Sequence, residues 1–549
     1  MHIEKNVFDN IIYTLLHDKD KSKDHVEARK DLQDMGIKRD LWPDENENCR
    51  LASFAIPTNK RVDFLKTLKN ISVPDGYSSN ISRCVDLDKK RIFGLRSHDC
   101  HIIMEQLLPI AIRNVLPNHV VAVFVELSSF FRQLCSKSLS LSDLEKLQDR
   151  IVLTLCHLEM LFPTSFFTVM VHLTVHLVDE VIQGGPVHYR WMYFVERLLG
   201  HFKSIIGNKA QPEGSIAEGY IVEEALTLFS RYFEDIESRV DRPKRVNDGP
   251  NLNEASEMSS IFPTQGKPVG GSKTFTLTQL EKTQAHRYVL LNCAAVKPFI
   301  SEFRDYIRRS SRGRRPSITE VERRVNKEFP DWFPKRIMNP DIASTISTDL
   351  EFLAQGPCPD ARRFTTYNIN GFKFRTLSRE QGSQTQNSGV FLTSDTSCIA
   401  SNADRNARQA DLPYYGKLED IIELNYYGQF KVVLFKCKWA DTTRDRGFKS
   451  DAWNFNCVNF SRLIHIGDRE EHDPYIEASQ ANMVYYVNDE TDEGWSVAVH
   501  LKPRDLFDMG EIDEGETYEN EPFQQQEFEQ FFDVNYENVQ LAIEEHMFE

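Results

Sequence analysis

Residues 184–197 read GGPVHYRWMYFVER, and this stretch decides how the N-terminal half of the chain is expected to fold. Its Gly-Gly-Pro opening predicts a break between two helices, because glycine and proline are the strongest local breakers of regular structure. The apolar residues that follow recur at helical spacing and predict an amphipathic helix. One acid, Glu196, falls in the first turns of that helix, shortly after Arg190 and Trp191. The stretch therefore predicts a carboxylate held at the beginning of a helix.

The composition is that of an ordinary globular protein of several domains: 549 residues, 40% apolar and 27% charged. No run of about 18 apolar residues indicates a membrane span, and the N-terminus MHIEKNVFDN lacks a secretory signal pattern. The ten cysteines include no CxxC pair, which favours reduced thiols. We expect a protein of the nucleus or cytoplasm, neither secreted nor bound to a membrane, with no small-molecule substrate.

The charge is uneven along the chain. The net charge is -16, yet no lysine or arginine follows Arg504. An acidic tail of this kind, with a run of glutamines and scattered Phe, predicts disorder. The rest of the chain is therefore closer to neutral than the total suggests, and DNA binding is not excluded.

Patterns of apolar residues divide the chain into an all-α part followed by a β-rich part. Helical spacing dominates residues 1–45 and 100–232. In the C-terminal part, Asn370-Gly371 between aromatic and β-branched residues predicts a hairpin, and dense short strands over 413–502 predict a small antiparallel β-barrel-like domain. We divide the chain into a helical remnant (1–95), an all-α domain (96–235), a linker (236–275), a helical region with an arginine cluster (276–338), an extended connector with a hairpin (339–412), a small β domain (413–503) and the acidic tail (504–549).

Several ordered runs carry a family resemblance. They are HIEKNV at 2–7, SHDCH at 97–101, HLTVH at 172–176, RWMY at 190–193, PEGSIAEGY at 212–220 and FPDWF at 329–333. With them, most of the chain resembles the C-terminal half of the CACTA (En/Spm-type) transposase-like proteins of plants, including a C-terminal domain of unknown function. The resemblance implies a multidomain α+β protein whose helical part is the insertion and last helix of a truncated RNase H-like core.

In that family an Asp-Asp-Glu triad binds Mg²⁺ or Mn²⁺, and two-metal sites of this kind cleave phosphodiesters. The resemblance makes Glu196 the third acid and places the second Asp just before the N-terminal run. We expect Glu196 to be inactive in this chain, with no cofactor unless Mg²⁺ or Mn²⁺ binds a completed core. The alternative is a solvated helix carboxylate paired with Arg197 or Lys203. The family usually has Tyr-Pro-Phe-Glu-Arg where this chain has YFVER at 193–197.

The segment SHDCH supplies His98, Asp99, Cys100 and His101, which the resemblance places at the beginning of the helical insertion. Together with HLTVH at 172–176 these residues suggest a zinc site, because His172 and His176 share a helix face. A structural role that pins the insertion domain is favoured over zinc. Trp191 could likewise stack on an unpaired base, although a place in the core is favoured.

The arginine cluster is the best nucleic-acid candidate in the sequence. It contains Arg308, Arg309, Arg312, Arg314 and Arg315. Guanidinium groups match phosphate geometry, so DNA contact is one interpretation, and a nuclear-import signal or a solvated helix end are the others. Aromatic residues of the β domain could form a binding surface, but a core role is the default.

These observations favour a transposase-derived protein that is catalytically incomplete and associated with DNA or chromatin. Two alternatives stay open. The chain could be a subunit of an active transposase whose missing acids come from other transposase chains, or a protein-interaction module. We therefore expect no enzyme activity of the chain alone.

Overall fold

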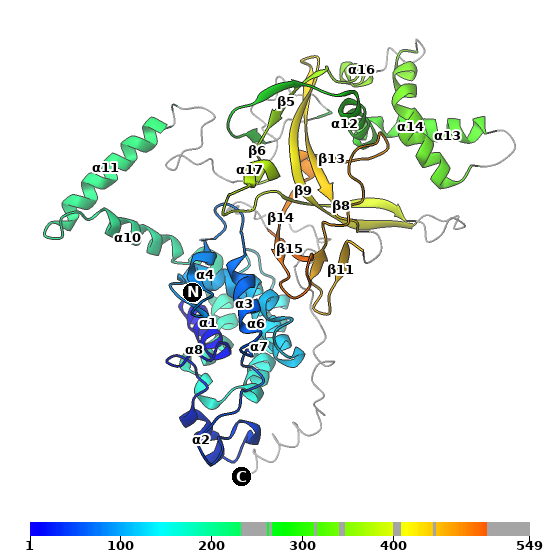
Figure 1. The fold of residues 1–549 in the computed structure, drawn as a ribbon. Helices are drawn as coiled ribbons and strands as arrows, with labels where there is room; N and C mark the ends of the chain where they lie inside the picture. The colour runs from blue at the N-terminus through cyan, green and yellow to red at the C-terminus, as the bar shows by residue number, and fades with distance from the viewer. Residues whose placement is uncertain are drawn as a thin grey trace.

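The helices and strands form two bodies and one projecting helical hairpin (Figure 1). They are seen in a computed structural model, which describes residues 1–78, 80–230, 232, 261–262, 266–311, 316–339, 346–398, 408–442 and 446–501. The N-terminal body is helical, and the C-terminal body surrounds an antiparallel sheet. A mixed α+β architecture with its helical part first is thereby confirmed. The acidic tail lies outside the described residues.

Nine α-helices of the described residues build the helical body. Its centre is α6, which is buried along most of its length because Val, Phe and Leu occupy nearly every turn. Helix α7 packs against α6 and begins at the expected cap. There the Ser140 hydroxyl accepts a hydrogen bond from the Asp143 backbone N–H at 3.2 Å. The helices are α1 (His2–Leu15), α2 (Val26–Asp34), α3 (Arg61–Lys69), α4 (Ser97–Ile102), α5 (Leu108–Ile112), α6 (Asn118–Leu134), α7 (Leu141–Leu161), α8 (Val169–His172) and α9 (Leu177–Gly184).

After the Gly-Gly-Pro break, α10 (Tyr193–Ile205) and α11 (Pro212–Ser230) project away from the helical body as a hairpin (Figure 1). The two helices are tied by His201, whose Nε2 lies 2.7 Å from an oxygen of Glu223. None of the described residues of α11 is buried. None of the helices in the described ranges has both the length and the apolar character needed to cross a bilayer.

The C-terminal body is organised by one long strand, β9 (Arg408–Tyr426). Along one edge it pairs first with β8 (Gly389–Cys398) and then with β5 (Asp360–Phe364), and along the other edge with β10 (Phe430–Trp439). The sheet continues through β11 (Phe448–Ser450), β12 (Asn456–Val458), β15 (Ser496–His500) and β14 (Asn482–Asn488) to β8, and through β10 to β13 (Tyr475–Glu477). A short strand, β4 (Lys273–Thr276), joins it through β5.

The expected barrel-like closure is wrong. Among the described strands, β11 and β13 end the main run of pairings and β4 ends the branch through β5. None of these three strands pairs with another of them, so no closed barrel is found. A register shift between Lys436 and Cys437 interrupts the β9–β10 ladder, and such irregularities bend a strand and increase its twist. Short aromatic-rich strands are compatible with open and closed sheets alike, because composition carries no information on register.

The predicted hairpin at Asn370-Gly371 is confirmed. It joins β6 (Thr366–Ile369) to β7 (Phe372–Arg375), and both turn residues have positive φ, 53° and 72°. Strand β3 (Lys267–Pro268) pairs with β6 in the same small sheet. Residues of the expected linker and connector thus contribute β3 to β8, and the β unit extends beyond 413–503. A further pair of two-residue strands, β1 (Val85–Asp86) and β2 (Arg91–Ile92), lies in the helical part.

Helices cover the β-rich body from several sides (Figure 1). Two of these helices begin at recognisable N-terminal caps. Thr278 and Glu281 form a capping box at the beginning of α12, and Ser317 caps the beginning of α14. The helices are α12 (Gln279–Asn292), α13 (Lys297–Ser310), α14 (Ile318–Ile337), α16 (Thr348–Gln355) and α17 (Leu377–Glu380).

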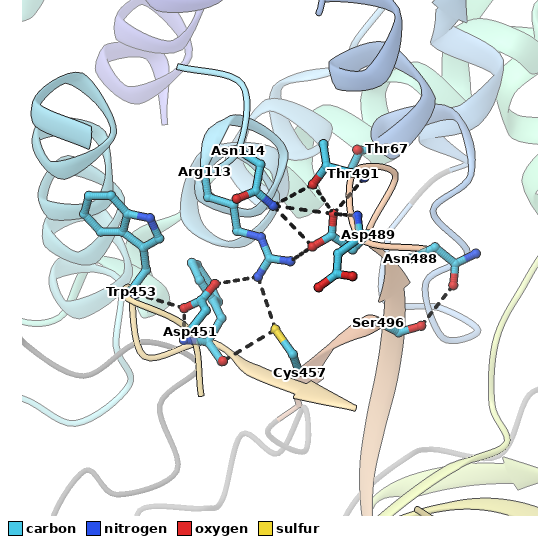
Figure 2. A network of polar contacts seen from close by, with 12 residues as sticks. Thr67, Arg113, Asn114, Asp451, Trp453, Cys457, Asn488, Asp489, Thr491 and Ser496 are labelled. Carbon is cyan, nitrogen blue, oxygen red and sulfur yellow. Dashed lines mark hydrogen bonds and ion pairs between the residues drawn. The ribbon is translucent and has the colours of Figure 1, made fainter. Parts of the chain in front are cut away.

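A buried arginine joins the two bodies (Figure 2). Arg113 follows α5 and is only 5% exposed. Its Nη1 donates to Oδ2 of Asp451 at 2.7 Å and lies 3.4 Å from the sulfur of Cys457, while its Nη2 donates to Asp489. Beside it, Asn114 Nδ2 donates to Thr491 Oγ1 at 2.8 Å. We call this group the Arg113 junction. It ties the end of α5 to β12 and to the loop between β14 and β15.

Candidate functional site

A buried polar cluster surrounds His101 in the helical body. The Nδ1 atom of His101 lies 2.7 Å from Glu4 Oε1 and 3.3 Å from Glu105 Oε1. All three residues are less than 8% exposed. The partly buried Cys135 completes the group, and the ligand atoms of Glu4, His101 and Cys135 all lie within 4.8 Å of one another. We call these four residues the His101 cluster.

Four helical segments place these side chains. Glu4 shares the inward face of α1 with Val7, Phe8 and Ile11, so helical periodicity turns a carboxylate toward the core. His101 belongs to α4, and Glu105 lies four residues later in a π-helical turn, Ile103–Leu107. Such single π-turns are rare and occur often at functional sites. Cys135 follows the last turn of α6.

Electrostatics favour a protonated His101. Burial alone would lower the pKa of its imidazole, but the charges of Glu105 and Glu4 more than offset this and raise the pKa to about 9. Burial raises the pKa of Glu105 to about 7, against the opposing charge of His101. The thiol of Cys135 has a pKa well above its usual range, because burial and the two carboxylates disfavour a thiolate. At neutral pH one imidazolium therefore faces two carboxyl groups and a neutral thiol.

Aromatic rings from the segment RWMY cover the cluster. The ring of Trp191 lies 5.0 Å from that of His101, and the ring of Tyr193 lies 5.4 Å from Trp191 and 5.3 Å from His98. Trp191 Nε1 and the Tyr193 hydroxyl are buried without a hydrogen-bond partner. The segments SHDCH and RWMY are far apart in the sequence, and the structure brings His98, His101 and Trp191 together.

Glu196 lies outside this cluster, in the first turn of α10. Its Oε1 is 3.8 Å from His2 Nε2, and its side chain is 43% exposed. Within the described residues Glu196 belongs to no group of three potential metal ligands. The side chain of Arg197, one of its two expected partners, lies outside the described part of the chain.

The other residues of the predicted motifs have local roles. Arg190 Nη2 donates to the carbonyl of Gly185 at 3.0 Å, and its guanidinium packs where a Cβ at Gly184 would lie only 2.6 Å away. Asp99 accepts a hydrogen bond from the backbone N–H of Arg96 at 3.0 Å and caps α4. Cys100 is fully buried, and burial raises the pKa of its thiol to about 12.

The histidines of HLTVH lie apart from the His101 cluster. His172 and His176 face each other, with 3.3 Å between their Nε2 atoms, and this contact is exposed. The helix is broken there, because α8 ends at His172 and a 3-10 turn, Leu173–His176, follows. Neither residue belongs to the group around His101.

The arginine cluster is described only in part. Arg308 and Arg309 are exposed in the last turn of α13, and Arg308 forms an ion pair with Asp305 at 3.1 Å. Arg312, Arg314 and Arg315 lie outside the described residues. The exposed pair at a helix end is compatible with phosphate contact and with solvation alike.

Two stretches of the sequence match known families. Residues 134–247 match the domain of unknown function DUF4218, and residues 422–498 match the domain of unknown function DUF4216. The chain carries two domains of unknown function. Both are typical of plant transposase-like proteins. No curated protein and no solved structure matches the chain.

Each match covers part of one of the two polar groups, the His101 cluster and the Arg113 junction. DUF4218 supplies Cys135, Trp191 and Glu196, so the His101 cluster joins α1 and α4 to that domain. The DUF4216 match contains Asp451, Cys457 and Asp489, so the Arg113 junction joins the end of α5 to the segment that matches DUF4216. Sequence reasoning missed Glu4, Glu105 and Cys135. The spacing of His101 and Glu105 by four residues on one helix was a signal, as was an acid on the apolar face of α1.

Proposed function

We propose that this chain is a transposase-derived protein of the plant CACTA type, catalytically incomplete in isolation and associated with DNA in the nucleus. The pairing of DUF4218 with DUF4216 supports a transposase-derived origin. Its partners would be DNA, chromatin proteins and other transposase chains.

One contact carries the proposal. His2, at the beginning of α1, lies 3.8 Å from Glu196 although the two residues are far apart in the sequence. The resemblance predicts that the N-terminal run follows a catalytic Asp and that Glu196 is the third acid. A fold inherited from a transposase would bring these two segments together. If Glu196 were only a solvated helix carboxylate, nothing would require it to lie beside the N-terminal run.

A DNA-cleavage assay tests the incompleteness. We expect purified protein with Mg²⁺ or Mn²⁺ to leave supercoiled DNA intact, because one carboxylate cannot hold two metal ions. Glu196→Gln and the matched exposed control Glu213→Gln should then behave alike. Metal-dependent nicking that disappears in Glu196→Gln and persists in Glu213→Gln would contradict the proposal.

DNA association is tested by its dependence on salt. Each phosphate contact contributes about -0.9 to the slope of log affinity against log salt concentration. We expect Arg308→Gln with Arg309→Gln to weaken binding and to reduce that slope by about 2. The control removes two exposed lysines of the helical body, Lys19→Gln with Lys89→Gln. Equal losses in both pairs would indicate an unspecific charge effect, and no binding at all would favour the protein-interaction module.

The acidic tail gives a second test of DNA association. Its charge would compete with DNA for the same arginines. Removal of residues 508–549 should therefore tighten DNA binding, most strongly at low salt. An unchanged affinity would exclude this competition.

Complementation in trans is the second candidate function, and the exposure of Glu196 favours it. A carboxylate that is 43% exposed remains accessible to acids of another chain. Mixing this chain with a transposase variant that lacks its own third acid should restore metal-dependent cleavage. The Glu196→Gln variant should not restore it.

A further inference from the structure

The His101 cluster combines three kinds of metal-binding atom in one buried place. It offers a ring nitrogen, a sulfur and carboxylate oxygens, contributed by α1, α4, the π-turn and the end of α6. Among these ligand atoms, those of Glu4, His101 and Cys135 lie within 4.8 Å of one another.

Glu105 is enclosed within the cluster. Its Oε1 is buried, with the side chain 9% exposed, and forms no hydrogen bond of good geometry. Its carboxylate interacts with the imidazole of His101 and with the thiol of Cys135. It points at His101, whose Nδ1 lies 3.3 Å away and already contacts Glu4 at 2.7 Å. A single N–H shared between two carboxylates bonds each of them less well than a separate donor would. The charge of Arg132 also acts on Glu105. The nitrogen, sulfur and oxygen atoms nevertheless converge from separate segments, and one divalent cation could contact them together.

We propose that Glu4, His101 and Cys135, with Glu105 as the fourth ligand, bind one Zn²⁺ ion that holds α1, α4 and α6 together. Zinc accepts nitrogen, sulfur and oxygen ligands in a tetrahedral arrangement. Mg²⁺ and Ca²⁺ prefer oxygen ligands, and Mg²⁺ keeps several waters, which suits neither a thiol nor this buried place. This ion would be structural and distinct from the catalytic metal ions of a transposase.

Small side-chain movements would suffice for coordination. Bonds of about 2.0 Å to nitrogen and oxygen and about 2.3 Å to sulfur put tetrahedral ligand atoms roughly 3.3–3.6 Å apart. The 3.3 Å separation of His101 from Glu105 already fits this spacing, and the 2.7 Å contact with Glu4 would open by under about 1 Å. Rotation of the carboxylates could supply that change without a shift of the helices.

Zinc would take the place of protons. The imidazolium proton of His101 and the thiol proton of Cys135 would leave to solvent as the Nδ1 and Sγ atoms become ligands. The same negative surroundings that hold these protons also attract a divalent cation. Binding is therefore expected to release protons and to weaken as the pH falls.

The experiment uses the full-length protein and zinc alone as the probe. His172 and His176 form an exposed imidazole pair that could bind zinc by itself, so the measurements are made in a His172→Asn, His176→Asn background. We expect one zinc per chain after removal of excess metal, and replacement by Co²⁺ should give the near-ultraviolet charge-transfer band of a cobalt–thiolate bond. Cys135→Ser should abolish that band, whereas the exposed control Cys156→Ser should leave it unchanged.

Two results would overturn the proposal. One is a folded protein that retains no zinc at a one-to-one ratio. The other is bound Co²⁺ whose spectrum is the same in Cys135→Ser. If Cys135→Ser does not fold, proton release on adding zinc to the unsubstituted protein decides the question, because its absence shows that neither the imidazole nor the thiol becomes a ligand. The cleavage assay with Glu196→Gln is independent of all these outcomes.

Discussion

The Arg113 junction and the His101 cluster contain the same kinds of charged group but differ in the cation at their centre. Each places one cationic side chain between two carboxylates beside a thiol: Arg113 with Asp451, Asp489 and Cys457, and His101 with Glu4, Glu105 and Cys135. Arginine brings five N–H donors in a planar fork and keeps its charge at any physiological pH. Histidine presents one ring nitrogen to both carboxylates and can lose its charge.

This difference teaches that the same charges can make a permanent connection or a responsive one. Arg113 donates to a carboxylate with each of its two terminal nitrogens, so both partners are bonded. At His101 a single ring nitrogen faces both carboxylates, 2.7 Å from Glu4 and 3.3 Å from Glu105. The first group is suited to holding DUF4216 against the helical body under all conditions, and the second is open to protons and metal ions.

The largest effect is expected when the permanent connection is broken. Arg113→Ala leaves two carboxylates at the interface without their cation, and we expect the free energy of unfolding to fall by about 3–5 kcal/mol. Arg113→Lys should lose less, because a lysine keeps the charge without the fork. Urea denaturation measures both.

A matched control limits the interpretation of that loss. Arg304 pairs with Glu322 at 2.9 Å, and both side chains are 38% exposed. Removal of an exposed pair costs about 0–1 kcal/mol, so Arg304→Ala should be nearly neutral. A loss in Arg113→Ala no larger than in Arg304→Ala would mean that the two bodies do not depend on the junction.

A smaller effect on the free energy of unfolding is expected from a change of pH, and it should come from the His101 cluster. The pKa of His101 is raised from 6.5 to about 9, so the folded state holds this proton more tightly than the unfolded state. The resulting stabilisation is complete below about pH 6.5 and is lost as the pH rises to 9, a change on the order of 3 kcal/mol. Glu105, with its pKa raised to about 7, acts in the same direction between about pH 4.5 and 7.

Unfolding should be measured from pH 6 to 9 with a chelator present, so that bound metal does not obscure the protons. His101→Asn is expected to flatten the curve over this range, and Arg113→Lys is expected to leave its shape intact. A curve that is equally steep in His101→Asn would assign the pH dependence to other groups.

The smallest effect concerns the aromatic cover. The hydroxyl of Tyr193 is buried without a hydrogen-bond partner, and burial raises its pKa. Tyr193→Phe removes that hydroxyl and should be neutral or stabilising by up to about 1 kcal/mol. A clear loss in thermal unfolding would show that the hydroxyl has a partner, and the cluster would then extend further than described.

Much of the architecture followed from local sequence patterns, and the partners in these groups did not. Helical periodicity and the Asn370-Gly371 turn are local signals and predicted the helical body and the hairpin. The open sheet was missed because β8, β9 and β10 acquire their register through contacts between strands. His101 drew attention through its motif, but Glu4 lies 97 positions away, and Arg113 meets Asp451 and Asp489 across 338 and 376 positions. No short window of sequence contains such pairs.

Strand β9 has a consequence for where the C-terminal part of this chain could be divided. The DUF4216 match begins at residue 422, near the end of the strand, whereas β8 pairs with its earlier residues at 408–417. The matched segment is therefore shorter than the segment whose strands pair with one another. A fragment cut at 422 would leave the β9 edge of β10 unpaired from Phe435 to Trp439, and unpaired edges invite aggregation. The matched segment and the folded unit therefore begin at different places, and we expect residues 422–498 alone to be less stable than a segment that keeps β8 and all of β9.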